Sequence, residues 1–128
     1  MVAMYIPRLL EGSLRQSLKT FPAVVVTGPR QAGKSTLVQK AGGEHYRYVS
    51  LDEMDIRSLA LNDPRGFLTK YSPPVIIDEI QHTPGLLSYI KAMIDRDRKP
   101  GQWILTGSQA FPLMRNVGES LGSVDFSS

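Results

Sequence analysis

The sequence predicts an α/β fold in which a mainly parallel sheet of about four strands lies between two layers of helices. Two apolar runs, residues 23–27 and 75–77, are rich in branched side chains, as buried parallel strands are. A glycine-rich loop leads from the first run directly into a helical pattern. Further strand patterns at residues 46–51 and 102–106, with helical patterns between them, complete the alternation of strands and helices.

The loop after the first strand fits the phosphate-binding pattern G-x-x-x-x-G-K-[ST], which predicts a P-loop NTPase core. The residues expected to bind the nucleotide are Gly28, Pro29, Arg30, Gln31, Ala32, Gly33, Lys34, Ser35 and Thr36. The glycines let several N–H groups point at one anion, and the helix N-terminus adds positive potential. Lys34 is expected to reach the β- and γ-phosphates, and the hydroxyl of Ser35 to bind Mg²⁺.

Two carboxylates, Asp78 and Glu79, follow the apolar run at residues 75–77. In open α/β sheets, ligands bind outside the carboxyl ends of the strands, so these side chains are expected to meet a Mg²⁺-nucleotide. We expect Asp78 to belong to the magnesium shell through water, and Glu79 to orient and deprotonate an attacking water molecule. A carboxylate beside the magnesium Asp favours water as the nucleophile over the acceptor of a small-molecule kinase.

The chain before the first strand is expected to form a short arm and one helix, which Pro7 starts. Leu10, Leu14 and Leu18 recur every four residues, so this helix has one apolar face that should pack on the core.

The acidic residues after the second strand have two interpretations. Asp52 is placed to cap the next helix, whereas Asp52, Glu53 and Asp55 together resemble a metal cluster. Carboxylates at a helix start are stabilised by the unpaired N–H groups, which favours capping. His82 has no second ligand at metal spacing and is expected to be structural or solvated.

Two polar side chains lie where the fourth strand ends. Thr106 and Ser108 could hydrogen-bond the γ-phosphate or the attacking water, because this strand is expected beside the one that carries Asp78. The alternative is that these hydroxyls cap the turn.

The composition is that of an ordinary globular domain. The chain has 128 residues, of which 41% are hydrophobic and 21% charged, with a net charge of +3. The sequence contains no basic run or basic-aromatic stripe, so nucleic-acid binding is not indicated. The composition does not exclude such binding. The lack of cysteine excludes disulfides. With neither a signal pattern nor a membrane span, we expect a cytoplasmic protein without membrane contact.

The motifs together resemble the AAA-type ATP-binding proteins of prokaryotes, which are similar to the AAA+ superfamily and usually carry a C-terminal domain of unknown function. The resemblance covers about residues 5 to 121 and is carried by Tyr5-Ile6-Pro7-Arg8, residues 27–37, Ser50-Leu51-Asp52, residues 77–81 and Leu105-Thr106-Gly107-Ser108. It implies a RecA/AAA-like three-layer core that binds ATP and Mg²⁺. It also implies that Lys34, Ser35, Asp78 and Glu79 have the roles given above.

The resemblance does not extend into the last residues. Relatives continue after a Ser-Leu like Ser120-Leu121 with a small residue, Gly and Arg, and then with a further strand and a second domain. Residues 122–128 are rich in Ser and Gly without strand periodicity, so we expect a core at residues 1–121, a short tail and no last strand. The edge of the first strand would then be exposed. C-terminal truncation accounts for this pattern, and Arg115 is the only nearby arginine that could stabilise phosphoryl transfer.

The leading expectation is a P-loop ATPase core that binds ATP and Mg²⁺ and hydrolyses ATP slowly in isolation. A nucleotide-binding module without hydrolysis, or a truncated remnant, is the alternative, and a small-molecule kinase is less favoured. ATP is the expected ligand, while self-association and a protein partner stay open.

Overall fold

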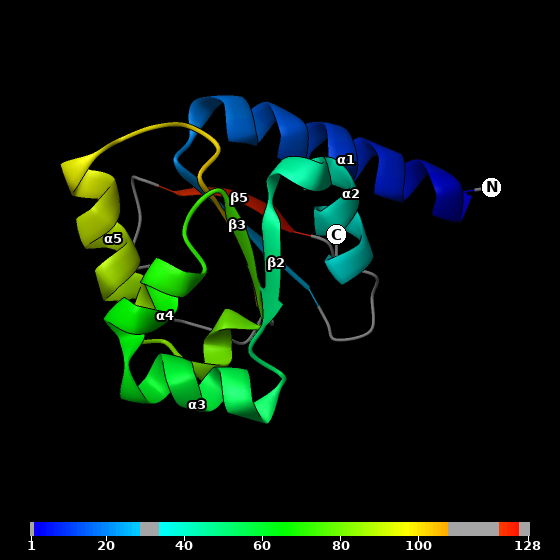
Figure 1. Cartoon of the computed structure of the whole chain (residues 1–128). Coiled ribbons are helices and arrows are strands. Elements are labelled where there is room, and N and C mark those ends of the chain that lie inside the picture. Colours follow the sequence, from blue (N-terminus) through cyan, green and yellow to red (C-terminus); the bar gives the residue numbers. More distant parts are fainter. Residues whose placement is uncertain (1, 29–33, 108–120, 126–128) are drawn as a thin grey trace.

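A parallel sheet of five strands forms the centre of the computed structural model, which describes residues 2–28, 34–107 and 121–125 (Figure 1). The order across the sheet is β2-β3-β4-β1-β5, and every pair of neighbours is parallel. The strands are β1 (Ala23–Thr27), β2 (Arg47–Ser50), β3 (Val75–Asp78), β4 (Trp103–Gly107) and β5 (Leu121–Asp125). This architecture confirms the predicted α/β fold with a parallel sheet between helices.

Helices cover both faces of the sheet (Figure 1). One face packs against α1 (Val2–Thr20) and α2 (Lys34–Gly42). The other face packs against α3 (Met54–Asn62), α4 (Pro64–Lys70) and α5 (Leu86–Arg96). Two short 3₁₀ helices, η1 (Gly43–His45) and η2 (Ile80–His82), follow α2 and β3. No helix in the described ranges is long and apolar enough to span a bilayer.

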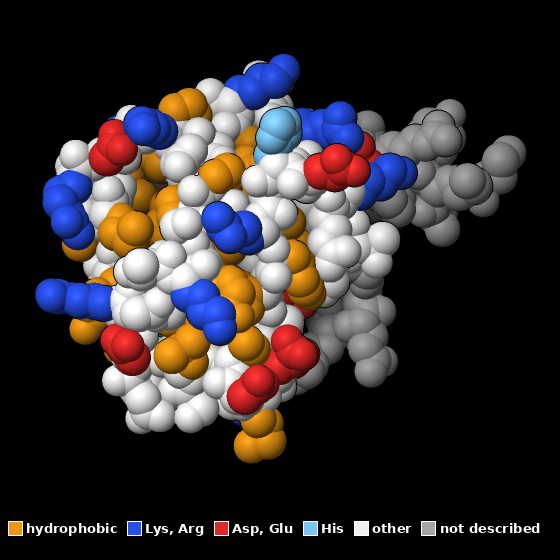
Figure 2. Space-filling model, viewed as in Figure 1, with side chains coloured by type: hydrophobic (Ala, Val, Ile, Leu, Met, Phe, Trp, Pro, Cys, Tyr) orange, Lys and Arg blue, Asp and Glu red, His pale blue; other side chains and the backbone are white. Residues whose placement is uncertain are grey.

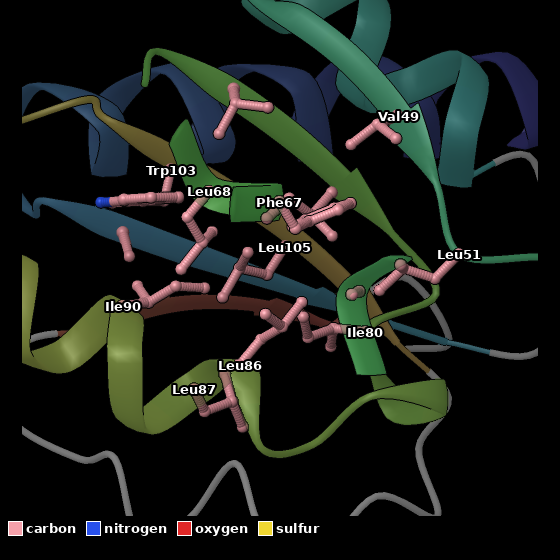
Figure 3. Close-up of a cluster of buried hydrophobic side chains, with 14 of the residues drawn as sticks. Val49, Leu51, Phe67, Leu68, Ile80, Leu86, Leu87, Ile90, Trp103 and Leu105 are labelled. Atoms are coloured by element: carbon pink, nitrogen blue, oxygen red, sulfur yellow. The ribbon is translucent and has the colours of Figure 1, made fainter. Parts of the chain in front are cut away.

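The strands supply two apolar cores because successive side chains point to opposite faces. Val25, Ile77 and Leu105 lie in the core on the α3–α5 side, and Figure 3 shows Phe67 and Leu86 gathered with Leu105. The side chains at the preceding positions, Val24, Ile76 and Ile104, lie in the core on the α1–α2 side. Burial on both faces explains why these strands are continuous apolar runs in the sequence.

The prediction that the last strand is missing is wrong. Leu121–Asp125 forms β5 and pairs with β1 along its whole length, from Ala23 opposite Leu121 to Thr27 opposite Asp125. The edge of β1 on this side is therefore covered. This strand has few branched apolar residues, and its pairing with β1 depends on backbone hydrogen bonds that a side-chain pattern does not reveal.

The helix before the first strand is longer than expected. It begins at Val2, so Pro7 lies inside α1 and does not start it. The predicted apolar face is confirmed, because Leu14 is fully buried and Leu10 and Leu18 pack partly buried beside it.

Charged side chains on the face shown in Figure 2 lie singly or in small groups. Lys and Arg alternate there with apolar and uncharged side chains, and no continuous basic stripe crosses this face.

Candidate functional site

The sheet order brings three strand ends together at one edge. β4 lies between β1 and β3, so the residues that follow β1 and β3 flank the end of β4. Gly28, directly after β1, is buried, and its N–H donates to the carbonyl oxygen of Gly107 at 3.3 Å. This is the edge at which open α/β sheets bind ligands.

The phosphate loop lies between a strand and a helix, as its motif requires. β1 ends at Thr27 and α2 begins at Lys34. The side chain of Lys34 lies outside the described part of the structure. So do five of the residues predicted to bind the nucleotide, which are Pro29, Arg30, Gln31, Ala32 and Gly33. Ser35 is half-buried in the first turn of α2, whereas Thr36 is exposed.

Asp78 accepts hydrogen bonds from hydroxyl groups on three different elements. The residue is 5% exposed. Oδ2 accepts from the hydroxyls of Ser35 on α2 and Tyr48 on β2, each at 2.7 Å. Oδ1 accepts from the hydroxyl of Thr106 on β4. Bonds to an ionised carboxylate are among the stronger hydrogen bonds, so these contacts hold both oxygens in place.

The hydrogen bond between Tyr48 and Asp78 also changes the pKa of Tyr48. Burial and the hydrogen bond to Asp78 raise the pKa of the Tyr48 phenol to about 12. The phenol is therefore a proton donor to Asp78 throughout the neutral pH range.

Glu79, directly after β3, is also 5% exposed and lies beside Asp78 in the chain. Its backbone is left-handed, with φ 62° and ψ 52°. Its N–H donates to Thr106 Oγ1 at 2.9 Å, and its Oε2 accepts from Gln81 Nε2 at 2.9 Å. A hydroxyl can donate once and accept as well, so Thr106 links the carboxylate of Asp78 to the backbone of Glu79.

Asp52 does not cap α3. The residue at the N-cap position is Glu53, without a side-chain cap hydrogen bond. Asp52 Oδ1 instead lies 2.9 Å from His82 Nε2, so His82 is paired and not merely solvated. Ligand atoms of Asp52, Glu79 and His82 lie within 4.8 Å of one another.

Three of the predicted site residues, Ser35, Asp78 and Thr106, are joined by direct hydrogen bonds, and Glu79 joins them through Thr106. Ser108 lies outside the described residues, as does Arg115. Tyr48 was missed. The available signal was its spacing of two residues from Tyr46, just before β2, which is the period of a strand. Only the pairing of β2 with β3 directs Tyr48 to Asp78.

The oxygen ligands offered at the start of α2 and the end of β3 suit a magnesium ion. Ser35 offers a hydroxyl oxygen and Asp78 a carboxylate oxygen, and Mg²⁺ prefers such hard oxygen ligands together with water and phosphate. The 2.7 Å hydrogen bond between them uses the hydroxyl proton of Ser35 and leaves its oxygen lone pairs for a cation.

Comparison with solved structures supports the fold. The Walker-type ATPase PABY2304 of Pyrococcus abyssi aligns with a TM-score of 0.61 and 17% identity over 93% of this chain and 52% of its own. A DNA replication initiation factor aligns with a TM-score of 0.55 and 18% identity over 91% of this chain and 44% of its own. PCH-2 of C. elegans gives a TM-score of 0.52 at 13% identity, over 99% and 43% of the two chains. At these identities the likeness concerns the P-loop ATPase fold.

Sequence comparison finds longer relatives. The uncharacterized proteins Rv2008c of Mycobacterium tuberculosis and Mb2031c of Mycobacterium bovis are each 34% identical over 108 residues, or 84% of this chain. The chain spans about a quarter of the length of these curated relatives, 24% in each case. The model of a family described as AAA domain matches residues 20–124, which include the phosphate loop, β1 to β4 and all but the last residue of β5. The chain therefore belongs to the AAA domain family of P-loop proteins.

Proposed function

We propose that this chain binds ATP together with Mg²⁺ and hydrolyses the γ-phosphate by attack of water. The observation that carries the proposal is the network around Asp78, in which Ser35 of the phosphate-loop helix and Thr106 of β4 both donate to one buried carboxylate. Glu79 lies next to this network and is tied to it through Thr106.

The loop and helix would hold the phosphates. Backbone N–H groups of residues 28–36 would surround the β-phosphate, and the ammonium group of Lys34 would contact the β- and γ-phosphates. Ser35 and Asp78 would hold Mg²⁺, Asp78 through water. The ion, when bound, neutralises charge that develops on the phosphate oxygens.

Glu79 would act on the water. Its Oε2 accepts from Gln81 Nε2, which holds the carboxylate beside the network around Asp78, where the attacking water would be oriented. As the water oxygen forms its bond to the γ-phosphorus, the bond to the β-γ bridging oxygen breaks and ADP leaves. The water proton passes to the carboxylate of Glu79. Thr106 and Ser108 would orient the water or the γ-phosphate.

Replacement of Glu79 tests this role. We expect Glu79→Gln to keep ATP affinity but to lower the rate of phosphate release in a single turnover with γ-labelled ATP by about 100-fold or more, the usual effect of losing a general base. Glu53→Gln is the matched control, because Glu53 is an exposed carboxylate without a side-chain cap bond. It should release phosphate at the wild-type rate.

The outcomes separate the alternatives. Equal rates in wild type and Glu79→Gln would rule out the proposed role of Glu79. ATP binding without phosphate release by the wild type would show a nucleotide-binding module. Transfer of the label to an added acceptor, with little inorganic phosphate formed, would show a kinase.

A further inference from the structure

The side chain of Tyr48 reaches the candidate magnesium site from the edge strand of the sheet. β2 pairs only with β3 among the described strands, and Tyr48 is 40% exposed there. Its hydroxyl nevertheless donates to Oδ2 of Asp78, the same oxygen that accepts from Ser35, and both distances are 2.7 Å.

The register explains this contact. Ser50 lies opposite Asp78 and Tyr48 lies opposite Ile76, so residues 48 and 78 are diagonal neighbours on one face of the β2-β3 pair. Diagonal neighbours are about 7 to 8 Å apart at the backbone, a span that a long aromatic side chain can bridge. The phenol therefore reaches Asp78 from the sheet itself and not from the nucleotide loop.

The hydrogen bonds of Asp78 leave one defined opening. A carboxylate has about four acceptor positions, two on each oxygen. Among the described residues, Ser35 and Tyr48 occupy both positions on Oδ2, and Thr106 occupies one on Oδ1. In the part of the chain that the structure describes, these bonds leave one position, on Oδ1, for a metal-bound water.

We propose that Tyr48 is a positioning residue that holds the Asp78 carboxylate in the orientation that receives Mg²⁺. This inference rests on the proposed function, since it concerns the same ion. Without the phenol hydroxyl, Oδ2 has a vacant acceptor position and the carboxylate loses one of the three hydroxyl donors that oppose its rotation. Mg²⁺ must then order the carboxylate as it binds, which weakens the binding of the ion but not that of the nucleotide alone.

The test measures binding without turnover. A non-hydrolysable ATP analogue is titrated calorimetrically into the chain in EDTA and at a series of Mg²⁺ concentrations. In Tyr48→Phe, we expect unchanged affinity in EDTA, while the Mg²⁺ concentration that gives half of the affinity gain rises about three- to tenfold, as the loss of one hydrogen bond implies.

Tyr46→Phe is the matched control. Tyr46 lies just before β2 and donates its hydroxyl to the carbonyl oxygen of Gly101 at 2.6 Å, so its loss removes a hydrogen bond of the fold without touching Asp78. This variant should lower the melting temperature and leave the Mg²⁺ titration at the wild-type position.

Each other outcome has a distinct meaning. A Mg²⁺ titration of Tyr48→Phe that coincides with the wild type would overturn the inference, as would an equal shift in Tyr46→Phe. An affinity loss of the same size in EDTA would also overturn it, because the role of Tyr48 would then be structural. If the wild type binds no nucleotide in either condition, the proposed function itself fails.

Discussion

Asp78 is 5% exposed, so its carboxylate loses most of its hydration on folding and must receive hydrogen bonds from donors in the protein instead. Among the described residues, the donors are three hydroxyl groups, those of Ser35, Tyr48 and Thr106. Hydroxyls stabilise the carboxylate without cancelling its charge, whereas an Arg or Lys partner would neutralise it. The arrangement is therefore suited to a residue whose charge is needed for a cation.

The pKa of Tyr48 leads to a prediction at alkaline pH. Burial, followed by the hydrogen bond to Asp78, raises this pKa from 10.0 to about 12. The folded chain therefore holds the phenol proton more tightly than the unfolded chain, so the contribution to stability is complete below about pH 10 and is lost as the pH rises to about 12. We expect the free energy of unfolding in urea to fall more steeply across this interval in wild type than in Tyr48→Phe. Parallel curves would show that folding does not favour the protonated phenol.

At the scale of the element, β3 ends because Glu79 turns the chain out of the sheet into η2. The left-handed conformation of Glu79, φ 62° and ψ 52°, costs about 1 kcal/mol or more for a residue with this side chain. Glycine would adopt it without strain. A glutamate occupies this strained position, and hydrogen bonds to Thr106 and Gln81 hold it there. Strained backbone at a candidate site is expected where the side chain, here the carboxylate, has a function.

Two substitutions measure this strain. Glu79→Ala and Glu79→Gly both remove the carboxylate and its hydrogen bond to Gln81, but only glycine relieves the left-handed backbone. We expect the glycine variant to be more stable than the alanine variant by about 1 kcal/mol in urea unfolding. If alanine is equal or more stable, the turn does not strain the chain at residue 79.

At the scale of the whole molecule, the strand order β2-β3-β4-β1-β5 assembles the site. β4 lies between β1 and β3 in the sheet. Asp78 at the end of β3 accepts hydrogen bonds from Ser35, which follows the loop after β1, and from Thr106 on β4. The apolar cores on the two faces fix the sheet, so the positions of these side chains follow from packing far from the site.

Local patterns in the sequence predicted one part of this arrangement. The strand and helix around the phosphate loop, and the acidic pair after β3, depend on residues that are adjacent in the chain. The contacts that were missed depend on which segments become neighbours. Tyr48 meets Asp78 only because β2 pairs with β3, and Asp52 meets His82 across the same two strand ends. β5 is likewise defined by its pairing with β1.

The most direct test of the central claim is a calorimetric titration of the chain with ATP in the presence of Mg²⁺, beside the same titration of Lys34→Ala. Lys34 begins α2 at the end of the phosphate loop, and its ammonium group is proposed to contact the β- and γ-phosphates. We expect saturable binding by the wild type and none by a folded Lys34→Ala variant. A folded wild type that binds no ATP, or a variant that binds as the wild type does, would contradict a nucleotide site at this loop.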